Sequence, residues 1–486
     1  MHDTILTTRR NLLKTAVFGA AAFTVSGPAA AEKTDGDDVP VCFSADVCVL
    51  GGSTTGVFAA VRAAEKGMRV AIVENEGFFG GTAVGGYVPI WHSLYDTTGK
   101  RQIISGLTDR IERELVKRRE AVMKDPASPS AGAILNVQAL SFALDSLVSA
   151  NPLIRPFLHA RVVAARKNPD GRVTHAIIED KDGRRAIAAK FFIDATGDAD
   201  FAVQAGLPTW KHARTDMQAH TTCAILSGID SLSRRRKDFS FGKILGRGGE
   251  AALDHSFWWG CEVVGCPSLT FFAGTRISKC DPSSADDLTR GEMEGRAQLK
   301  KIVDAVNRRF PPGKGRAPVA VAAVAPMMGI RESRHIDALY RVTKDDVLSG
   351  KRFDDVVARG SYRIDIHEGE GITFFYLDGR KERMVATENG KVKWEKSRWS
   401  AKDARHATWY EIPYRALVPK GSVNVICAGR MIDASREAYG AVRVMVNCNQ
   451  MGESAGLAAA RAVKEGLAAA DAYDGSAIPA PGQAML

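Results

Sequence analysis

One short stretch constrains the fold more than any other: VCVLGGSTTGVFAA, residues 47–60. An apolar strand over 46–50 runs into a glycine-dense turn, and a helix rich in small residues is predicted over 54–66. Gly67 is the type of residue that ends a helix, and the next apolar run predicts a second strand that ends at Glu74. Strand, turn, helix and strand in about thirty residues form a complete βαβ unit, which predicts a parallel sheet.

The glycine turn departs from the G-x-G-x-x-G pattern of dinucleotide-binding loops at one position. Gly51 and Gly56 are present, but the middle glycine is replaced by Ser53. Gly51 permits the tight turn, Gly56 lets the helix approach the strand, and the Ser53 hydroxyl can donate to a phosphate oxygen. Glu74, 23 residues after Gly51, is placed to accept hydrogen bonds from an adenosine ribose. A purely structural glycine turn is the alternative, but the complete βαβ unit with its acid favours dinucleotide binding.

Three further stretches join this first loop. A second glycine-rich run, NEGFFGGTAVGGYVP (75–89), is unnecessary for a nicotinamide cofactor but suits the longer FAD. Two later strands end at ATGDAD (195–200) and AGRMID (428–433). The simplest architecture gathers all of these at the carboxyl edge of one parallel sheet, where ligands bind in such folds.

Together these segments resemble the bacterial FAD-dependent oxidoreductases of the two-dinucleotide-binding-domain type. RESR (331–334), IDIH (364–367) and IPYRALVP (412–419) add to the resemblance, which spans about residues 45 to 465. It implies an α/β fold with an FAD/NAD(P)-binding Rossmann-like domain over 44–206 and 419–470, interrupted by an α+β substrate domain over 207–418.

The resemblance also implies positions that contact FAD. Gly452 to Gly456 would form the N-terminus of the last helix, facing the pyrimidine edge of the flavin. Arg436 stands where relatives often carry a histidine, and it could bind an anionic flavin or an anionic substrate. The implied cofactor-binding residues are Gly51, Gly52, Ser53, Thr54, Thr55, Gly56, Glu74, Gly80, Gly81, Thr82, Val162, Thr196, Gly197, Gly429, Asp433, Gly452 and Gly456.

Four other side chains are candidates for catalysis. Arg331 and Arg334 suit a carboxylate or a developing oxyanion, and a structural salt bridge with Glu332 or another nearby acid is the alternative. His367 could be a base oriented by an acid two residues earlier, or an ordinary strand histidine. His92 follows the second glycine run and is expected near the flavin ring. The histidines lack the spacing of metal ligands, so no metal site is predicted.

Residues 1–31 predict an export signal. Arg9 and Arg10 precede an apolar run and a PAAA cleavage site, which resembles a twin-arginine signal. The run of about a dozen residues is too short for the ~20 that span a bilayer, although an uncleaved anchor is the alternative. The formal net charge of +10 is spread along the chain without a nucleic-acid module. Cys261 and Cys266 are close enough in sequence to bridge in an oxidising compartment.

These observations predict an FAD-dependent oxidoreductase that is periplasmic or otherwise exported. It would transfer a hydride between a small organic substrate and FAD, and pass electrons to a quinone, a cytochrome, another carrier or oxygen rather than to a nicotinamide. The alternatives are a flavin-dependent reductase of an unsaturated acid and a non-catalytic FAD-binding electron-transfer subunit. A closed, polar substrate cavity would favour an enzyme over an electron-transfer subunit.

Overall fold

The computed structural model describes residues 39–126, 128, 132–246, 249–253, 255–313, 317–368, 371–387 and 391–475. The predicted export signal, residues 1–31, lies outside the described residues. Each of the eight cysteines lies inside them and is a free thiol, Cys261 and Cys266 included.

A seven-stranded sheet carries the βαβ unit read from the sequence. Its strand order is β6-β2-β1-β9-β8-β7, and the late strand β22 also pairs with β9. The pairs β1–β2, β2–β6, β1–β9 and β9–β22 are parallel, whereas β7–β8 and β8–β9 are antiparallel. The three glycine-ended strands therefore share one sheet, and the predicted α/β class is confirmed. The strands are β1 (Val41–Leu50), β2 (Val70–Val73), β6 (Ile154–Phe157), β7 (Arg161–Lys167), β8 (Val173–Asp180), β9 (Gly183–Asp194) and β22 (Val425–Cys427).

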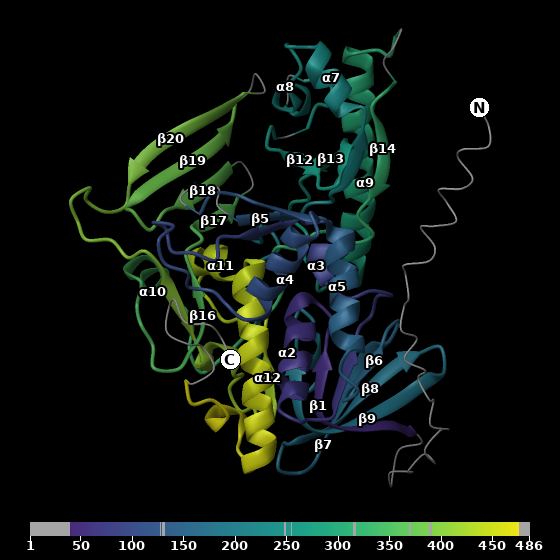
Figure 1. The fold of residues 1–486 in the computed structure, drawn as a ribbon, viewed down its shortest axis with the longest axis vertical. Coiled ribbons are helices and arrows are strands. Elements are labelled where there is room, and N and C mark those ends of the chain that lie inside the picture. Colours follow the sequence, from purple (N-terminus) through teal and green to yellow (C-terminus); the bar gives the residue numbers. More distant parts are fainter. Residues whose placement is uncertain are drawn as a thin grey trace.

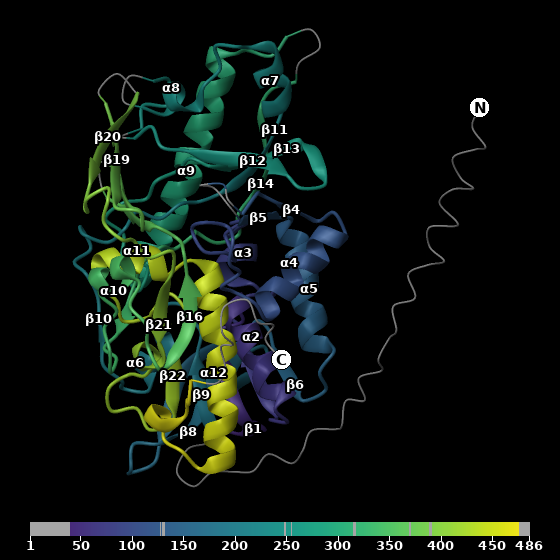
Figure 2. The ribbon, with the colours of Figure 1, turned by 60° about the vertical axis from the view of Figure 1, so that its left-hand side comes forward.

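Two helices from opposite ends of the sequence pack tightly against each other beside this sheet. They are α2 (Thr54–Glu65) and α12 (Met445–Glu465), which lie side by side in Figures 1 and 2. A Cβ on Gly452 would lie 2.2 Å from the Thr55 carbonyl oxygen, and one on Gly456 would lie 2.2 Å from that of Ala59. Only glycine permits so close an approach, so these two residues set the spacing of the helices.

Among the described residues, the rest of the chain forms five smaller sheets, two of which have four strands. One contains β11 (Ala224–Ser227), β12 (Trp259–Val263), β13 (Cys266–Ala273) and β14 (Ala320–Val324), with the long helix α9 (Ala285–Arg309) beside it (Figure 2). The other is the antiparallel sheet β17 (Ile364–His367), β18 (Gly371–Phe375), β19 (Arg380–Ala386) and β20 (Val392–Arg398). The remaining helices are α3 (Gly81–Val84), α4 (Leu107–Lys117), α5 (Val137–Ser149), α6 (Asp200–Gln204), α7 (Ile229–Arg235), α8 (Phe241–Leu245), α10 (Lys344–Ser349), α11 (Arg436–Val442) and the 3-10 turns at Tyr414–Leu417 and Ala469–Asp471. The remaining strands are β3 (Ile90–His92), β4 (Ala121–Met123), β5 (Gly132–Leu135), β10 (Thr209–Trp210), β15 (His335–Ile336), β16 (Val356–Gly360) and β21 (Tyr410–Pro413).

The largest hydrophobic core does not follow the predicted domain boundaries. It joins Val57 of α2 and Ala455 of α12 to Val357 of β16 and Tyr410 of β21, all of which are fully buried. The second part of the 207–418 segment thus shares a core with the sheet, and the division into domains stays a prediction.

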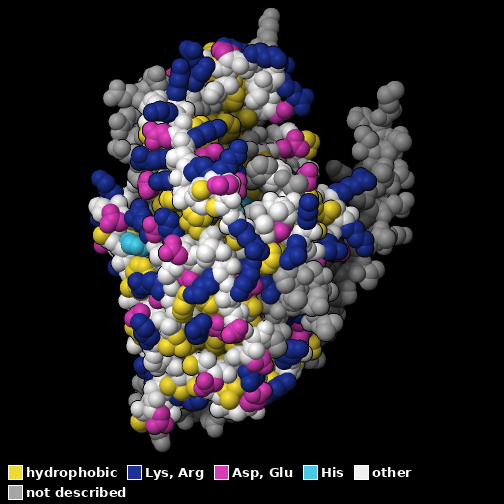
Figure 3. Space-filling view, turned by 90° about the vertical axis from the view of Figure 1, so that its left-hand side faces the viewer, with side chains coloured by type: hydrophobic (Ala, Val, Ile, Leu, Met, Phe, Trp, Pro, Cys, Tyr) yellow, Lys and Arg dark blue, Asp and Glu magenta, His cyan; other side chains and the backbone are white. Residues whose placement is uncertain are grey.

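The surface carries its charge in a dispersed form. On the face in Figure 3, lysine and arginine side chains alternate with acidic ones rather than gathering in one patch. None of the helices in the described ranges is both long and apolar enough to cross a membrane.

Candidate functional site

A cavity of about 1690 Å³ opens at the carboxyl ends of the parallel strands. Gly51 follows β1, Glu74 follows β2, Thr196 follows β9 and Gly429 follows β22, and all four line the cavity. The edge that the sequence predicted as a ligand site is therefore hollow.

The first glycine turn forms one end of the cavity. Gly51 has a φ of +103°, and a Cβ there would lie 2.4 Å from the Ala195 carbonyl oxygen. The Ser53 hydroxyl accepts a hydrogen bond from the Gly56 backbone N–H at 3.3 Å and caps α2. Ser53, at the middle position of the G-x-G-x-x-G pattern, is thus the N-cap of α2, a role that was not predicted from the sequence. The N-terminus of α2, including Thr54 and Thr55, faces the cavity, where its backbone N–H groups suit an anion.

Glu74 is held at the cavity wall by two backbone donors. Its Oε2 accepts from the Gly52 N–H at 2.6 Å, and its Oε1 accepts from the Glu76 N–H at 2.8 Å. Burial nevertheless raises the pKa of the Glu74 carboxyl to about 7. Gly52 lies behind the wall and acts through this hydrogen bond, because it does not line the cavity itself.

The other cofactor candidates divide into those that line the cavity and those that do not. Thr196 donates from its backbone N–H and its hydroxyl to the buried Asp194, which fixes the turn after β9. The backbone carbonyl of Val162 accepts a hydrogen bond from the Gln204 side chain at 3.0 Å. Those that line it are Gly51, Ser53, Thr54, Thr55, Glu74, Gly80, Gly81, Thr82, Val162, Thr196, Gly197 and Gly429.

Three further predicted contacts with the cofactor have other structural roles. Gly56 packs the start of α2 against the first turn, since a Cβ there would lie 1.8 Å from the Gly51 carbonyl oxygen. The prediction that the last helix begins near Gly452 is wrong: α12 begins at Met445, and Gly452 and Gly456 face α2 instead. Val444, Met445 and Cys448 line the cavity at that helix end.

Asp433 and Arg436 also lie outside the cavity lining. The buried Asp433 carboxylate accepts from Arg341 Nε at 2.7 Å and from the Ala338 N–H at 3.0 Å, so its acceptors serve the protein itself. Arg436 donates to the backbone carbonyl of Asp216 at 2.9 Å. Arg436 therefore contacts the protein backbone and does not line the cavity, where we expected it to meet a flavin or a substrate.

The remaining four catalytic candidates all line the cavity, but they are held differently. Arg334 donates to Asp200 Oδ1 at 2.7 Å and to the Ser283 carbonyl at 3.1 Å, so it is a structural ion pair at the cavity wall. Arg331 donates to the Thr221 hydroxyl at 2.8 Å and contacts no carboxylate within ion-pair distance among the described residues. Burial and the neighbouring Arg443 lower the pKa of Arg331 to about 10.

Asp365 organises the groups around it. Its Oδ2 accepts from the Tyr362 hydroxyl at 2.9 Å, and its Oδ1 lies 3.2 Å from His367 Nε2. Burial opposes ionisation, but His367, Arg443 and Arg363 hold the pKa of the Asp365 carboxyl well below its usual value. Burial and the charge of Arg331 lower the pKa of His367 to about 3. The Asp365 carboxylate thus lies beside the His367 imidazole inside the cavity.

His92 lies on the other side of Tyr362. The two rings lie 3.9 Å apart between centroids, and burial together with Arg363 lowers the pKa of His92 to about 3. A third buried histidine, His220, has a structural role. Its Nε2 lies 3.0 Å from the Cys280 carbonyl oxygen, and its Nδ1 accepts a hydrogen bond from the Arg331 backbone N–H at 3.2 Å.

Three arginines and a tyrosine in this cluster were missed by the sequence reading. Tyr362 and Arg363 directly precede the IDIH motif, which was the available signal for them. Arg443 lies just before the last helix, in a stretch to which the sequence analysis gave no role. Arg276 offered no signal; it reaches the cavity from the end of β13 and donates to the Gly371 carbonyl at 3.0 Å. Burial and Arg331 lower its pKa to about 10.

Comparisons with known proteins bear on this site. The model of the family described as FAD dependent oxidoreductase matches residues 46–473. No curated protein sequence matches the chain. One similar solved structure is a geranylgeranyl bacteriochlorophyll reductase-like protein from Thermoplasma acidophilum, with 14% identity, a TM-score of 0.44, and coverage of 87% of this chain and 80% of that one. Another is p-nitrophenol 4-monooxygenase from Pseudomonas putida, with 13% identity, a TM-score of 0.40, and coverage of 90% and 85%.

Proposed function

The chain belongs to the family of FAD-dependent oxidoreductases, and from this premise we propose that it oxidises a small organic acid by transferring a hydride to FAD. FAD is the cofactor of this family. The observation that carries the proposal is the cluster around Asp365, which faces the same cavity as the glycine turns.

The glycine-lined end of the cavity fits FAD. The N-terminus of α2 presents backbone N–H groups that suit a pyrophosphate. Gly51 leaves no room for a side chain between the turn and β9, so the ligand would approach bare backbone. Glu74 would accept hydrogen bonds from the adenosine ribose. When bound, FAD supplies a ring system that takes up two electrons as a hydride from a substrate C–H bond.

The arginines indicate an anionic substrate. Arg276, Arg331, Arg363 and Arg443 line one region of the cavity, and Asp365 is the carboxylate set among them. Burial and Arg443 lower the pKa of Arg331, and burial and Arg331 lower the pKa of Arg276, so neighbouring positive charges repel one another there. A substrate carboxylate would relieve this repulsion and form charge-assisted hydrogen bonds.

His367 is the residue that we assign as the base. Burial and Arg331 lower its pKa in the free protein; a bound substrate carboxylate would offset the charge of Arg331, and Asp365, 3.2 Å from Nε2, would stabilise the imidazolium that forms. In the oxidation of a hydroxy acid, His367 would take the proton of the substrate hydroxyl, and bound FAD would supply the acceptor for the hydride of the same carbon. The product is a carbonyl compound, and the two electrons leave to a quinone or a cytochrome.

A catalytic role is favoured over that of an electron-transfer subunit by the lining of the cavity. Ionisable groups with strongly shifted pKa values gather at catalytic sites, and here two histidines and a carboxylate face the same space. Export of the folded enzyme remains part of the proposal, and the paired Arg9 and Arg10 support it. Changing both to lysine should leave the protein in the cytoplasmic fraction; unchanged export would contradict the proposed signal.

The test is anaerobic reduction of the bound flavin. The purified holoenzyme is mixed with a panel of hydroxy acids, neutral sugars and amines, and bleaching of the visible flavin band is followed. We expect bleaching by a hydroxy acid, and a much slower reaction in Arg331→Gln than in the control Arg380→Gln, whose side chain lines the cavity but pairs with Asp378 at 2.7 Å. If no hydroxy acid reduces the flavin but an unsaturated acid reoxidises the reduced enzyme, the enzyme would be a reductase and the proposed direction of the reaction would be wrong. Bleaching by neutral sugars or amines alone would overturn the choice of an acid.

A further inference from the structure

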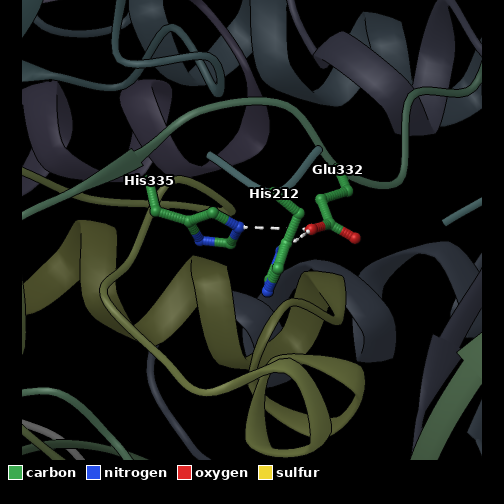
Figure 4. Close-up of side chains that lie close together, drawn as sticks. All are labelled: His212, Glu332 and His335. Carbon is green, nitrogen blue, oxygen red and sulfur yellow. Dashed lines mark hydrogen bonds and ion pairs between the residues drawn. The ribbon is translucent and has the colours of Figure 1, made fainter. Parts of the chain in front are cut away.

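A second cluster of ligand-type side chains lies beside the cavity, on segments far apart in the sequence. His212 follows β10, whereas Glu332 and His335 lie just before and at the start of β15, which pairs with β10. His212 Nδ1 lies 2.5 Å from Glu332 Oε1, and His335 Nε2 lies 3.6 Å from the same oxygen. Figure 4 shows both imidazoles turned toward the Glu332 carboxylate. One ligand atom from each residue falls within 4.8 Å of the others.

The imidazole of His335 is fixed with one nitrogen available. Its Nδ1 lies 3.0 Å from the Ile432 carbonyl oxygen, so Nδ1 carries the proton and Nε2 keeps its lone pair. His335 is completely buried, and Nε2 has no hydrogen-bond partner within the described part of the chain. Trp210 stacks on the ring at 4.4 Å and prevents it from turning away. A histidine whose other nitrogen donates to a backbone carbonyl is the usual arrangement of a metal ligand.

Glu332 is equally well oriented. Its Oε2 accepts from the Gln218 backbone N–H at 3.1 Å, which leaves Oε1 directed at the two imidazoles. Glu332 is buried, whereas His212 is partly exposed and opens the cluster to solvent. An ion could therefore enter past His212, and that side chain is the one free to adjust.

We propose that His212, Glu332 and His335 bind a divalent transition metal ion of the zinc type, with water as the fourth ligand. Metal–ligand bonds of about 2.0–2.2 Å in a tetrahedron place ligand atoms roughly 3.4 Å apart. The His335–Glu332 separation of 3.6 Å already matches this spacing. The His212–Glu332 contact is a hydrogen bond at 2.5 Å, and it lengthens when the ion replaces the shared proton.

The position of the cluster gives the ion a structural role. Glu332 lies between Arg331 and Arg334, which both line the cavity. The Tyr439 hydroxyl donates to the Arg331 carbonyl at 2.7 Å, and the Tyr439 ring packs edge-on against His335 at 4.5 Å. A metal ion would tie the segment after β10 to the segment that carries both arginines. Metal binding does not depend on the proposed reaction, so the two can fail separately.

Zinc binding to the holoenzyme tests the inference. After treatment with a chelator, the protein is dialysed against ZnCl₂ and its zinc content is measured, with flavin absorbance as the check of folding. We expect one zinc ion per chain, a higher melting temperature with zinc, and at least about a 100-fold loss of affinity in His335→Ala, since even outer-shell partners are worth 10–100-fold. The control is His406→Ala, which alters a partly exposed histidine outside the cluster.

His212→Ala provides the second variant. Because its side chain is partly exposed, this variant should retain FAD even if His335→Ala does not, and it should lose zinc to the same extent. Absence of zinc from the wild-type protein, or equal zinc binding by wild type and His212→Ala, would overturn the proposal. Loss of zinc in His406→Ala as well would place the ion elsewhere and also overturn it.

Discussion

Replacing Glu74 with glutamine should weaken FAD binding and remove most of its pH dependence. The Glu74 carboxylate, already held by two backbone donors, is the group that we expect to receive the ribose hydroxyls. A hydrogen bond to a charged acceptor contributes about 1.5–3 kcal/mol, and every 1.4 kcal/mol changes a dissociation constant about tenfold. We therefore expect FAD to bind Glu74→Gln roughly 10- to 100-fold more weakly than wild type at pH 8.

The raised pKa of Glu74 sets the sign of the pH effect. In the free protein this carboxyl takes up a proton as the pH falls through about 7, whereas the bound cofactor needs it ionised. Protons and FAD then compete, so the wild-type affinity should fall by up to about tenfold for each pH unit below 7 and level off above it. Glu74→Gln has no titrating group here, and its affinity should stay nearly constant.

Titration of the apoprotein with FAD, followed by quenching of flavin fluorescence, measures both effects. Glu76→Gln is the matched control, because it removes the same charge from a neighbouring residue of the cavity wall. The reasoning is refuted if wild-type affinity is equal at pH 5.5 and pH 8. It is also refuted if Glu74→Gln and Glu76→Gln bind FAD equally well.

Three other substitutions test separate parts of the structure. Asp365→Asn removes the carboxylate that would stabilise the protonated base, so it should slow flavin reduction by the acid found in the panel by up to about 10²- to 10⁴-fold, the full contribution of a general base. Substrate binding should not weaken, since a negative charge is lost. Stopped-flow traces that match wild type would contradict the support of His367 by Asp365. Glu112 is buried, and burial raises the pKa of its carboxyl to about 8. The free energy of unfolding of the wild-type protein should therefore fall as the pH rises from about 4.5 through 8, by up to about 1.4 kcal/mol per pH unit. Denaturant titration of Glu112→Gln should show a flatter dependence on pH. Gly452→Ala would place a Cβ 2.2 Å from the Thr55 carbonyl oxygen of α2 and should lower the free energy of unfolding by at least about 1–3 kcal/mol. Gly313→Ala, which places a Cβ in open space, should leave it unchanged. Equal melting temperatures of the two variants would disprove the close packing of α2 and α12.

The local features of the cofactor end could be predicted from the sequence because they depend on neighbouring residues. Gly51, Ser53 and Glu74 belong to one βαβ unit, and the chain geometry alone brings the end of one strand beside the end of the next. The positions on the last helix could not be predicted in the same way. Which face of α12 meets α2 depends on how two helices from opposite ends of the chain pack, and Gly452 reports that packing rather than a ligand.

The residues at the substrate end of the cavity were harder to predict from the sequence for a related reason. Arg276, Arg363 and Arg443 come from three different parts of the chain. Arg363 directly precedes the IDIH motif, but nothing in the local sequence of Arg276 distinguishes it from a surface arginine. The Asp365–His367 pair was visible because its two members are separated by one residue on the same strand. The cluster of His212, Glu332 and His335 was missed for the same reason. His212 and Glu332 lie 120 positions apart in the sequence, so a search for closely spaced ligands does not find them.

The pairing of β22 with β9 has a consequence for the order of biosynthesis. The turn after β22 forms one wall of the cavity and the start of α12 forms another, yet both segments lie more than 400 residues into the chain. A ribosome-bound chain can form the βαβ unit early, but it lacks these walls until β22 and the start of α12 have emerged. A nascent chain of 400 residues would therefore already contain the first glycine turn and Glu74 but could not yet enclose FAD.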